Sequence, residues 1–154
     1  MEEKILLTRI LDFHKHSKIV KKSWGYEKII ANDSYCLKVL SVNAKQGCSM
    51  HYHLQKQETF YVVVGVLKVE FIDPDSGKCS YVTMKQGESI TIHQGQAHRF
   101  TAVEHGAEFI EASTYDDPKD SYRVCASNLD EPEWRYGSSE AEIPVSFLLS
   151  RGFS

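Results

Sequence analysis

The chain has 154 residues, of which 42% are hydrophobic, and its formal net charge is −3 at pH 7. This length suits one domain whose core needs no disulfide to support it. The longest basic run is Lys21-Lys22, so no nucleic-acid surface is expected, and no apolar stretch is long enough to span a membrane. The four cysteines lack paired spacing, and the amino terminus lacks a signal-peptide pattern. We therefore expect a cytoplasmic protein with free thiols.

The first segment of the chain is predicted to be helical. Between residues 3 and 16, Leu6, Ile10 and Phe13 recur at a spacing that places them on one face of a helix. We expect residues 1–22 to form a short N-terminal helical extension. Its apolar stripe would pack on the domain or on a partner subunit.

Residues 23–127 are predicted to form an all-β domain. Short apolar runs alternate with turn residues such as those of 73–77, which favours an antiparallel sandwich or barrel. The predicted strands are Tyr26–Ala31, Tyr35–Val42, Ser49–His53, Glu58–Val64, Leu67–Ile72, Cys79–Met84, Ser89–Ile92, His98–Ala102 and Ala107–Ser113. Residues 128–154 show little periodicity, so we expect an irregular segment packed on the barrel, with Val145–Leu149 docking on it.

Three histidines and one glutamate have the spacing of a metal site. His51 and His53 point to the same face of a predicted strand, because side chains alternate along a strand. Glu58 follows five residues later, and His98 comes from a distant strand. Such a set suits one divalent transition metal, Zn, Mn, Fe, Co or Ni, and leaves positions open for substrate.

The register of these strands also predicts what surrounds the metal. If Glu58 and His98 point inward, the alternate residues of their strands point inward as well. These residues are Phe60, Val62, Val64, Phe100 and Ala102. We expect them to give the metal a dry, apolar lining that controls access of water to the ion.

Two motifs of the chain resemble those of the cupin superfamily. The first consists of Gly47, His51, His53, Glu58 and Gly65, and the second of Gly87, His93, Gly95, His98 and Ala102. The chain departs from the family where His93 replaces a proline, Ala102 replaces an asparagine, and Gly47 lies closer to the histidines. None of these changes removes a ligand. The resemblance implies an antiparallel jelly-roll barrel, also called a double-stranded β-helix.

Within the cupins, residues 22–124 resemble the cupin domain of type II phosphomannose isomerases. These proteins combine mannose-phosphate isomerase and guanylyltransferase activities. The similar pieces are Trp24-Gly25-Tyr26-Glu27, Lys38, His98-Arg99-Phe100, Glu111 and Asp120-Ser121-Tyr122-Arg123. The nucleotidyltransferase part has no counterpart here, so the resemblance implies only the isomerase reaction.

An aldose–ketose isomerase moves a proton between adjacent carbons and must stabilise an enediolate, which a divalent metal can do. The resemblance makes Glu111 the candidate base. Lys38, Arg99 and Arg123 are candidates to hold a sugar phosphate, and Tyr26 to line the mouth of the pocket. A solvent-facing carboxylate, surface ion pairs and a supporting aromatic residue are the alternative interpretations of these residues.

Three other functions remain open at this point. The same ligands suit a mononuclear Fe(II) dioxygenase. A non-enzymatic metal- or sugar-binding cupin would keep the metal and lack a base. A nucleotide-sugar epimerase is less favoured, because such cupins often work without metal. In every case we expect a small-molecule partner, and a homodimer that covers an exposed sheet edge.

Overall fold

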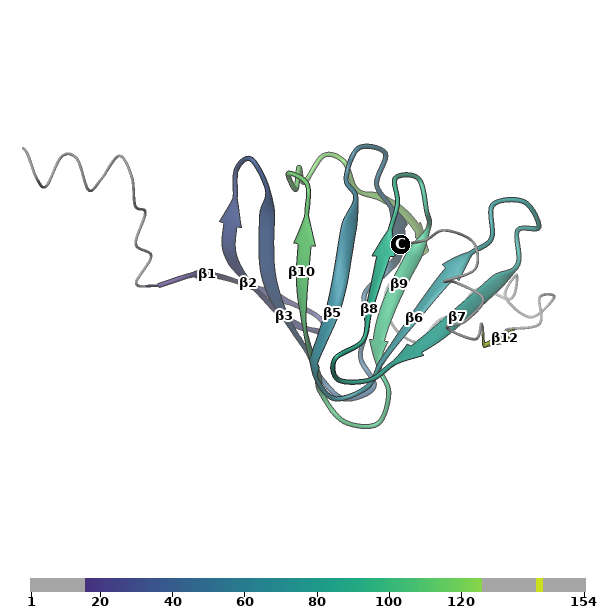
Figure 1. Cartoon of the computed structure of the whole chain (residues 1–154), viewed down its shortest axis with the longest axis horizontal. Helices are drawn as coiled ribbons and strands as arrows, with labels where there is room; N and C mark the ends of the chain where they lie inside the picture. Colours follow the sequence, from purple (N-terminus) through teal and green to yellow (C-terminus); the bar gives the residue numbers. More distant parts are fainter. Residues whose placement is uncertain (1–15, 126–140, 143–154) are drawn as a thin grey trace, which may run out of the picture.

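The computed structural model describes residues 16–125 and 141–142, and every regular element in that part of the chain is a β-strand (Figure 1). The strands are β1 Lys18–Lys22, β2 Gly25–Asn32, β3 Cys36–Val42, β4 Met50–Tyr52, β5 Glu58–Val64, β6 Leu67–Ile72, β7 Cys79–Met84, β8 Ser89–Ile92, β9 His98–Ala102, β10 Ala107–Ser113, β11 Tyr122–Cys125 and β12 Ala141–Glu142. No helix in these residues could cross a bilayer.

The strands form two sheets of six, which lie in the orders β1-β2-β3-β10-β5-β8 and β11-β4-β9-β6-β7-β12. All neighbours pair antiparallel except β12 and β7, which are parallel. Strands that are distant in sequence therefore become neighbours, as β10 between β3 and β5 shows in Figure 1. The predicted all-β jelly roll is confirmed. All nine predicted strands are present, with ends that agree within one residue.

The ends of the chain differ from the prediction. Residues 18–22 were expected in the helical extension, but they form β1 at the edge of the first sheet. Because three residues of this strand are lysines, its sequence does not show the apolar alternation that is typical of a strand. Charged side chains are common on edge strands. Residues 1–15, which include nearly all of the predicted helix, and the Val145–Leu149 segment lie outside the described residues. Of the expected irregular segment 128–154, the structure describes only β12.

The core lies between the inner faces of the two sheets. β3, β5 and β10 contribute Leu40, Val42, Phe60, Val62 and Phe109, and the other sheet contributes Leu67, Val69, Val82, Met84, Phe100 and Ala102. The ring centroids of Phe60 and Phe109 lie 4.8 Å apart, and those of Phe100 and Phe109 lie 5.0 Å apart. Aromatic pairs at this separation add to the stability gained from burial. This rigid cluster supports the strands that carry the candidate site.

One residue of the predicted lining faces the other way. Val64 pairs with Glu108, whereas Val62 pairs with Phe109, so β5 contains one more residue than β10 over this step. Such a bulge turns the following side chain. Val64 is 56% exposed as a result, and the expectation that it lines the interior is wrong.

Gly65 connects β5 and β6 at a point where no side chain fits. Its φ is 83°, and an added Cβ would lie 2.6 Å from the carbonyl oxygen of Gly106. Gly77 has a similar φ of 67° but nothing within 4 Å of an added Cβ. We expect Gly77→Ala to destabilise the fold by about 1 kcal/mol through backbone strain alone. Gly65→Ala adds a steric overlap and should cost about 2 kcal/mol or more in urea unfolding. Equal losses would contradict this account.

Candidate metal centre

The structure brings the four predicted ligands together. His51 lies in β4 and pairs directly with His98 of β9, His53 follows β4, and Glu58 is the first residue of β5. One ligand atom from each of the four residues lies within 4.8 Å of the others. Two sheets and a loop thus deliver three imidazoles and one carboxylate to one point, in a geometry that could hold a metal ion.

Hydrogen bonds set the orientation of all three imidazole rings. Each Nδ1 lies at hydrogen-bond distance from a backbone carbonyl oxygen, which can only accept, so Nδ1 carries the proton. The acceptors for His51, His53 and His98 are the carbonyls of Ser49, Asp120 and Gln96, at 2.7, 2.5 and 2.8 Å. In a neutral ring the Nε2 atom then carries no proton and presents its lone pair. Metal-binding histidines are generally held in this way.

Three of the converging atoms are buried without a hydrogen bond among the described residues, namely His53 Nε2, Glu58 Oε1 and His98 Nε2. His98 Nε2 lies 2.6 Å from Glu58 Oε1, but the contact is not directed as a hydrogen bond. Lone pairs that converge in a buried place repel each other and lose their hydration. A divalent cation would satisfy all of them at once, so the residues present fit a metal ion.

The protonation states also suit a metal. Burial lowers the pKa of His51 to about 4 and lowers that of His53, so both rings are neutral at pH 7. Burial alone would raise the pKa of Glu58, but its contacts with His98 and Lys56 outweigh burial and lower it. Since metal ligands must be deprotonated, these groups are ready to bind without first losing protons.

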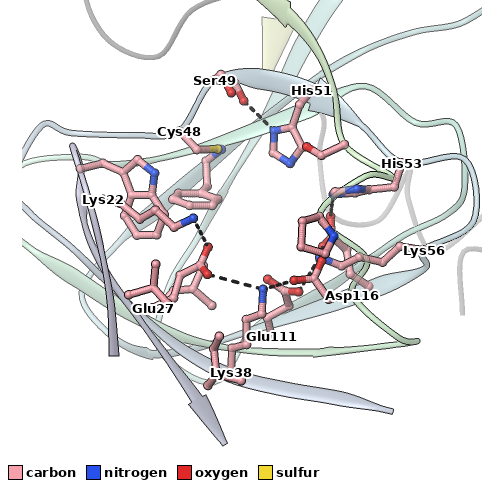
Figure 2. A pocket seen from close by; sticks show the side chains of 18 of the residues that line it. Lys22, Glu27, Lys38, Cys48, Ser49, His51, His53, Lys56, Glu111 and Asp116 are labelled. Carbon is pink, nitrogen blue, oxygen red and sulfur yellow. Dashed lines mark hydrogen bonds and ion pairs between the residues drawn. The ribbon is translucent and has the colours of Figure 1, made fainter. Parts of the chain in front are cut away.

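A cavity of about 500 Å³ opens beside the four ligands. Figure 2 shows its labelled side chains arranged around an open centre, with the histidines on one side and Glu111 and Lys38 on another. Part of the wall is apolar and includes Trp24, Leu40, Phe60 and Phe100. The rest is charged and includes Glu27, Lys38, Lys56, Glu111, Asp116 and Arg123. An apolar wall with a few convergent polar groups is typical of small-molecule sites.

Of the predicted catalytic and substrate-binding residues, Glu111, Lys38 and Arg123 line this cavity, whereas Arg99 and Tyr26 do not. Arg99 lies between two inward-facing residues of β9, so its side chain leaves by the opposite face of the sheet. There its guanidinium pairs with Glu70, with Nε 2.6 Å from Oε2. Tyr26 likewise alternates with the inward Glu27 and is exposed. The structure thus places both residues away from the site.

Lys56 is a buried residue of the site that sequence reasoning missed. It lies in the loop between two ligands, where a lysine is usually solvated. Its Nζ is 2.9 Å from Glu58 Oε2, 2.6 Å from Glu111 Oε1 and 3.1 Å from Asp116 Oδ1. These carboxylates outweigh the effect of burial and raise the pKa of Lys56. The ammonium group therefore links a candidate metal ligand, Glu58, to the candidate base, Glu111.

Glu111 is fully enclosed beside this lysine. Burial and the charge of Glu58 raise its pKa, while the ammonium groups of Lys56 and Lys38 partly offset the shift. A carboxylate with a raised pKa is a stronger base when ionised, and such groups are concentrated at functional sites.

Asp120 was also absent from the predicted site. Its carboxylate accepts hydrogen bonds from the backbone N–H groups of Leu54, Gln55 and Lys56, at 2.9, 3.0 and 3.1 Å. Its carbonyl oxygen accepts the bond from His53 described above. One residue thus holds both a ligand and the loop that carries Lys56. The sequence offered no sign of this contact, because the partners lie more than 60 residues apart.

Comparisons with known proteins agree with this geometry. Residues 38–110 match the family model of the cupin domain. A search of curated proteins finds no relative. Among solved structures, an oxalate decarboxylase variant from Bacillus subtilis is 17% identical with a TM-score of 0.63, over 70% of this chain and 30% of that one. The capsular polysaccharide assembling protein CapF from Staphylococcus aureus is 19% identical with a TM-score of 0.66, over 75% and 33%.

This chain spans about a third of the length of both proteins, so the likeness concerns only part of each. At such low identity it shows the fold and not the reaction. The family match covers the strands that carry His51, Glu58 and His98. Residues 38–110 of this chain therefore match the cupin domain, and their strands belong to the antiparallel jelly roll described above.

Proposed function

We propose that this protein is a metal-dependent aldose–ketose isomerase that acts on a sugar or a sugar phosphate. One observation carries the proposal. The buried carboxylate of Glu111 lies in the same cavity as the three-histidine, one-glutamate cluster and is linked to it through Lys56. The reaction requires both elements, a site for a Lewis acid and a base beside it.

A divalent cation held by the four ligands would polarise the carbonyl and hydroxyl oxygens of the substrate. The chain itself provides the proton transfer. Glu111 accepts a proton from one substrate carbon and delivers a proton to the neighbouring carbon, while the hydroxyl proton passes to the former carbonyl oxygen, so that no electrons are gained or lost overall. Lys56 holds the Glu111 carboxylate in place through its 2.6 Å contact. The apolar wall formed by Phe60 and Phe100 excludes water during the transfer.

The charges in the cavity indicate where a phosphate would lie. Lys38 is already neutralised by Asp116, 2.5 Å away, and by Glu27, 3.5 Å away. Arg123 lines the cavity and is exposed, and none of the described residues forms an ion pair with it. One arginine side chain can bind two oxygens of a phosphate group at the same time. We therefore infer that Arg123, and not Lys38, contacts the phosphate of a phosphorylated substrate.

The oxalate decarboxylase of Bacillus subtilis holds Mn(II) centres, which makes Mn(II) one reasonable metal for this site. The likeness does not favour a decarboxylase reaction here, since one fold hosts many chemistries. The Fe(II) dioxygenase interpretation predicts oxygen consumption, and an isomerase does not need oxygen. The two functions can therefore be separated by a single experiment.

The test uses metal-depleted protein reloaded without oxygen with Mn(II), Zn(II), Co(II), Ni(II) or Fe(II). Each form is incubated in D₂O with mannose 6-phosphate and with free aldoses and ketoses, and the products are followed by NMR. We expect conversion between aldose and ketose, with deuterium incorporated at C1 or C2. Absence of conversion and exchange with every metal, or oxygen consumption by the Fe(II) form on return to air, would contradict the proposal.

A further inference from the structure

The connection between β10 and β11, residues 114–121, lies against the charged side of the cavity, and we call it the strap. It is fastened to the ligand loop at both of its ends. The N–H of Thr114 donates to the carbonyl of Gln57 at 3.0 Å, and the N–H of Gln57 donates to Thr114 Oγ1 at 3.1 Å. Asp120 holds the same loop at the other end, as described above. The strap therefore has a defined position relative to Lys56.

Asp116 is fixed in the middle of the strap. The amide of Asn32, at the tip of the β2–β3 hairpin, makes two bonds to its backbone. Asn32 Nδ2 donates to the Asp116 carbonyl at 3.0 Å, and the Asp116 N–H donates to Asn32 Oδ1 at 2.9 Å. The Asp116 side chain is then directed into the cavity, where Figure 2 shows it between Lys56 and Glu111.

The two oxygens of the Asp116 carboxylate hold two different lysines. Oδ2 lies 2.5 Å from Lys38 Nζ, and Oδ1 lies 3.1 Å from Lys56 Nζ. Lys38 and Glu111 are paired across β3 and β10, so their side chains project from the same face of the sheet within reach of each other. In the structure Lys38 instead contacts Asp116 and Glu27. Asp116 thus separates two ammonium groups that could both approach Glu111.

We propose that Asp116 is a positioning residue that assigns Lys56 to Glu111 and keeps Lys38 away from it. The inference rests on the proposed function, in which Glu111 transfers the proton. Both contacts that described residues make with the Glu111 carboxylate, from Lys56 and from Ser113, fall on Oε1. The other oxygen, Oε2, is therefore left for the substrate.

The arrangement also surrounds the Lys56 ammonium group with three carboxylates. An ammonium group has three N–H donors, and Lys56 has three carboxylate partners, of which Asp116 is one. Without Asp116, Lys38 loses its nearest partner and Glu111 becomes an available one on the adjacent strand. Lys38 then binds Glu111 Oε2 and blocks the oxygen that accepts the proton.

The kinetic test is a double-mutant cycle. We expect Asp116→Asn to lower kcat by about 10-fold or more, with KM and metal content nearly unchanged. A small displacement of a catalytic group can lower the rate of the chemical step by this factor. Lys38→Met in the Asp116→Asn background should restore kcat to within about threefold of the Lys38→Met single variant, because the competing ammonium is gone. Asp33→Asn, which removes an exposed carboxylate from the same hairpin tip as Asn32, is the control and should leave kcat unchanged.

A structural readout separates this inference from the proposed function. In a crystal structure of Asp116→Asn we expect Lys38 Nζ within hydrogen-bond distance of Glu111 Oε2. If wild-type protein converts no sugar, the isomerase proposal fails while this readout still decides the role of Asp116. The inference would be overturned if Lys38 contacts only Glu27 in the Asp116→Asn structure. It would also be overturned if Lys38→Met does not relieve the loss of kcat. If Asp116→Asn does not fold, Asn32→Ala can replace it, because it releases the strap and keeps the Asp116 carboxylate. In this variant too we expect Lys38 to move towards Glu111.

Discussion

Replacing Glu111 with glutamine is expected to lower kcat for the sugar isomerisation by about 10²- to 10⁴-fold, the usual contribution of a general base. The amide has nearly the shape of the carboxylate, and its oxygen can still accept a hydrogen bond from Lys56. It cannot accept a proton from carbon. The chemical step should therefore be lost while the site keeps its geometry. Steady-state kinetics and metal analysis of the same preparation measure the two effects.

Glu108→Gln provides a matched control for this variant. Glu108 lies on the same strand, but Ala107, Phe109 and Glu111 face inward and Glu108 does not. We expect the kcat of Glu108→Gln to lie within about twofold of the wild-type value, as is usual for a surface substitution. Full activity of Glu111→Gln, with the metal still bound, would show that another group is the base.

Replacing His98 with alanine is expected to weaken metal binding by at least about 100-fold. Changing a residue that only supports a ligand commonly costs 10- to 100-fold in affinity, so loss of a ligand should cost no less. His98 is buried, and it pairs with His51 in the centre of the cluster. Calorimetric titration of metal-depleted protein with Zn(II) or Mn(II) gives the affinity directly.

Thermal unfolding provides a second measurement of the same loss. Metal at about 100 times its Kd should stabilise the wild-type fold by about 2.7 kcal/mol and should give little or no shift in His98→Ala. His105→Ala is the control, since His105 is exposed and outside the cluster. A metal-dependent shift in His98→Ala equal to that of wild type would exclude His98 as a ligand.

The strands could be predicted from the sequence because they follow from short-range alternation, and so does part of the candidate ligand set. The period of two places His51 and His53 on one face, and it also fixes which residues of β9 face inward. The same rule, applied strictly, would have placed Arg99 outside the cavity beside the inward-facing His98. The prediction for Arg99 follows instead from its resemblance to a family motif.

The residues missed by sequence reasoning act through contacts between distant segments. Asp116 and Asp120 approach Lys56 from about 60 residues away, and the resemblance that includes Asp120 does not indicate this contact. Lys56 is charged and lies in a loop, where solvent exposure is the ordinary expectation. The inversion of Val64 depends on a bulge in strand pairing, which is a property of the sheet and cannot be seen in one strand.

The central claim is that His51, His53, Glu58 and His98 hold one divalent cation. An anomalous difference map, from crystals grown with Mn(II) or Zn(II) and recorded at the absorption edge of that metal, tests it most directly. The structure predicts one peak at about 2.0–2.2 Å from three Nε2 atoms and from a Glu58 oxygen. A map without a peak among these four side chains, in crystals whose protein binds the metal in solution, would contradict the claim.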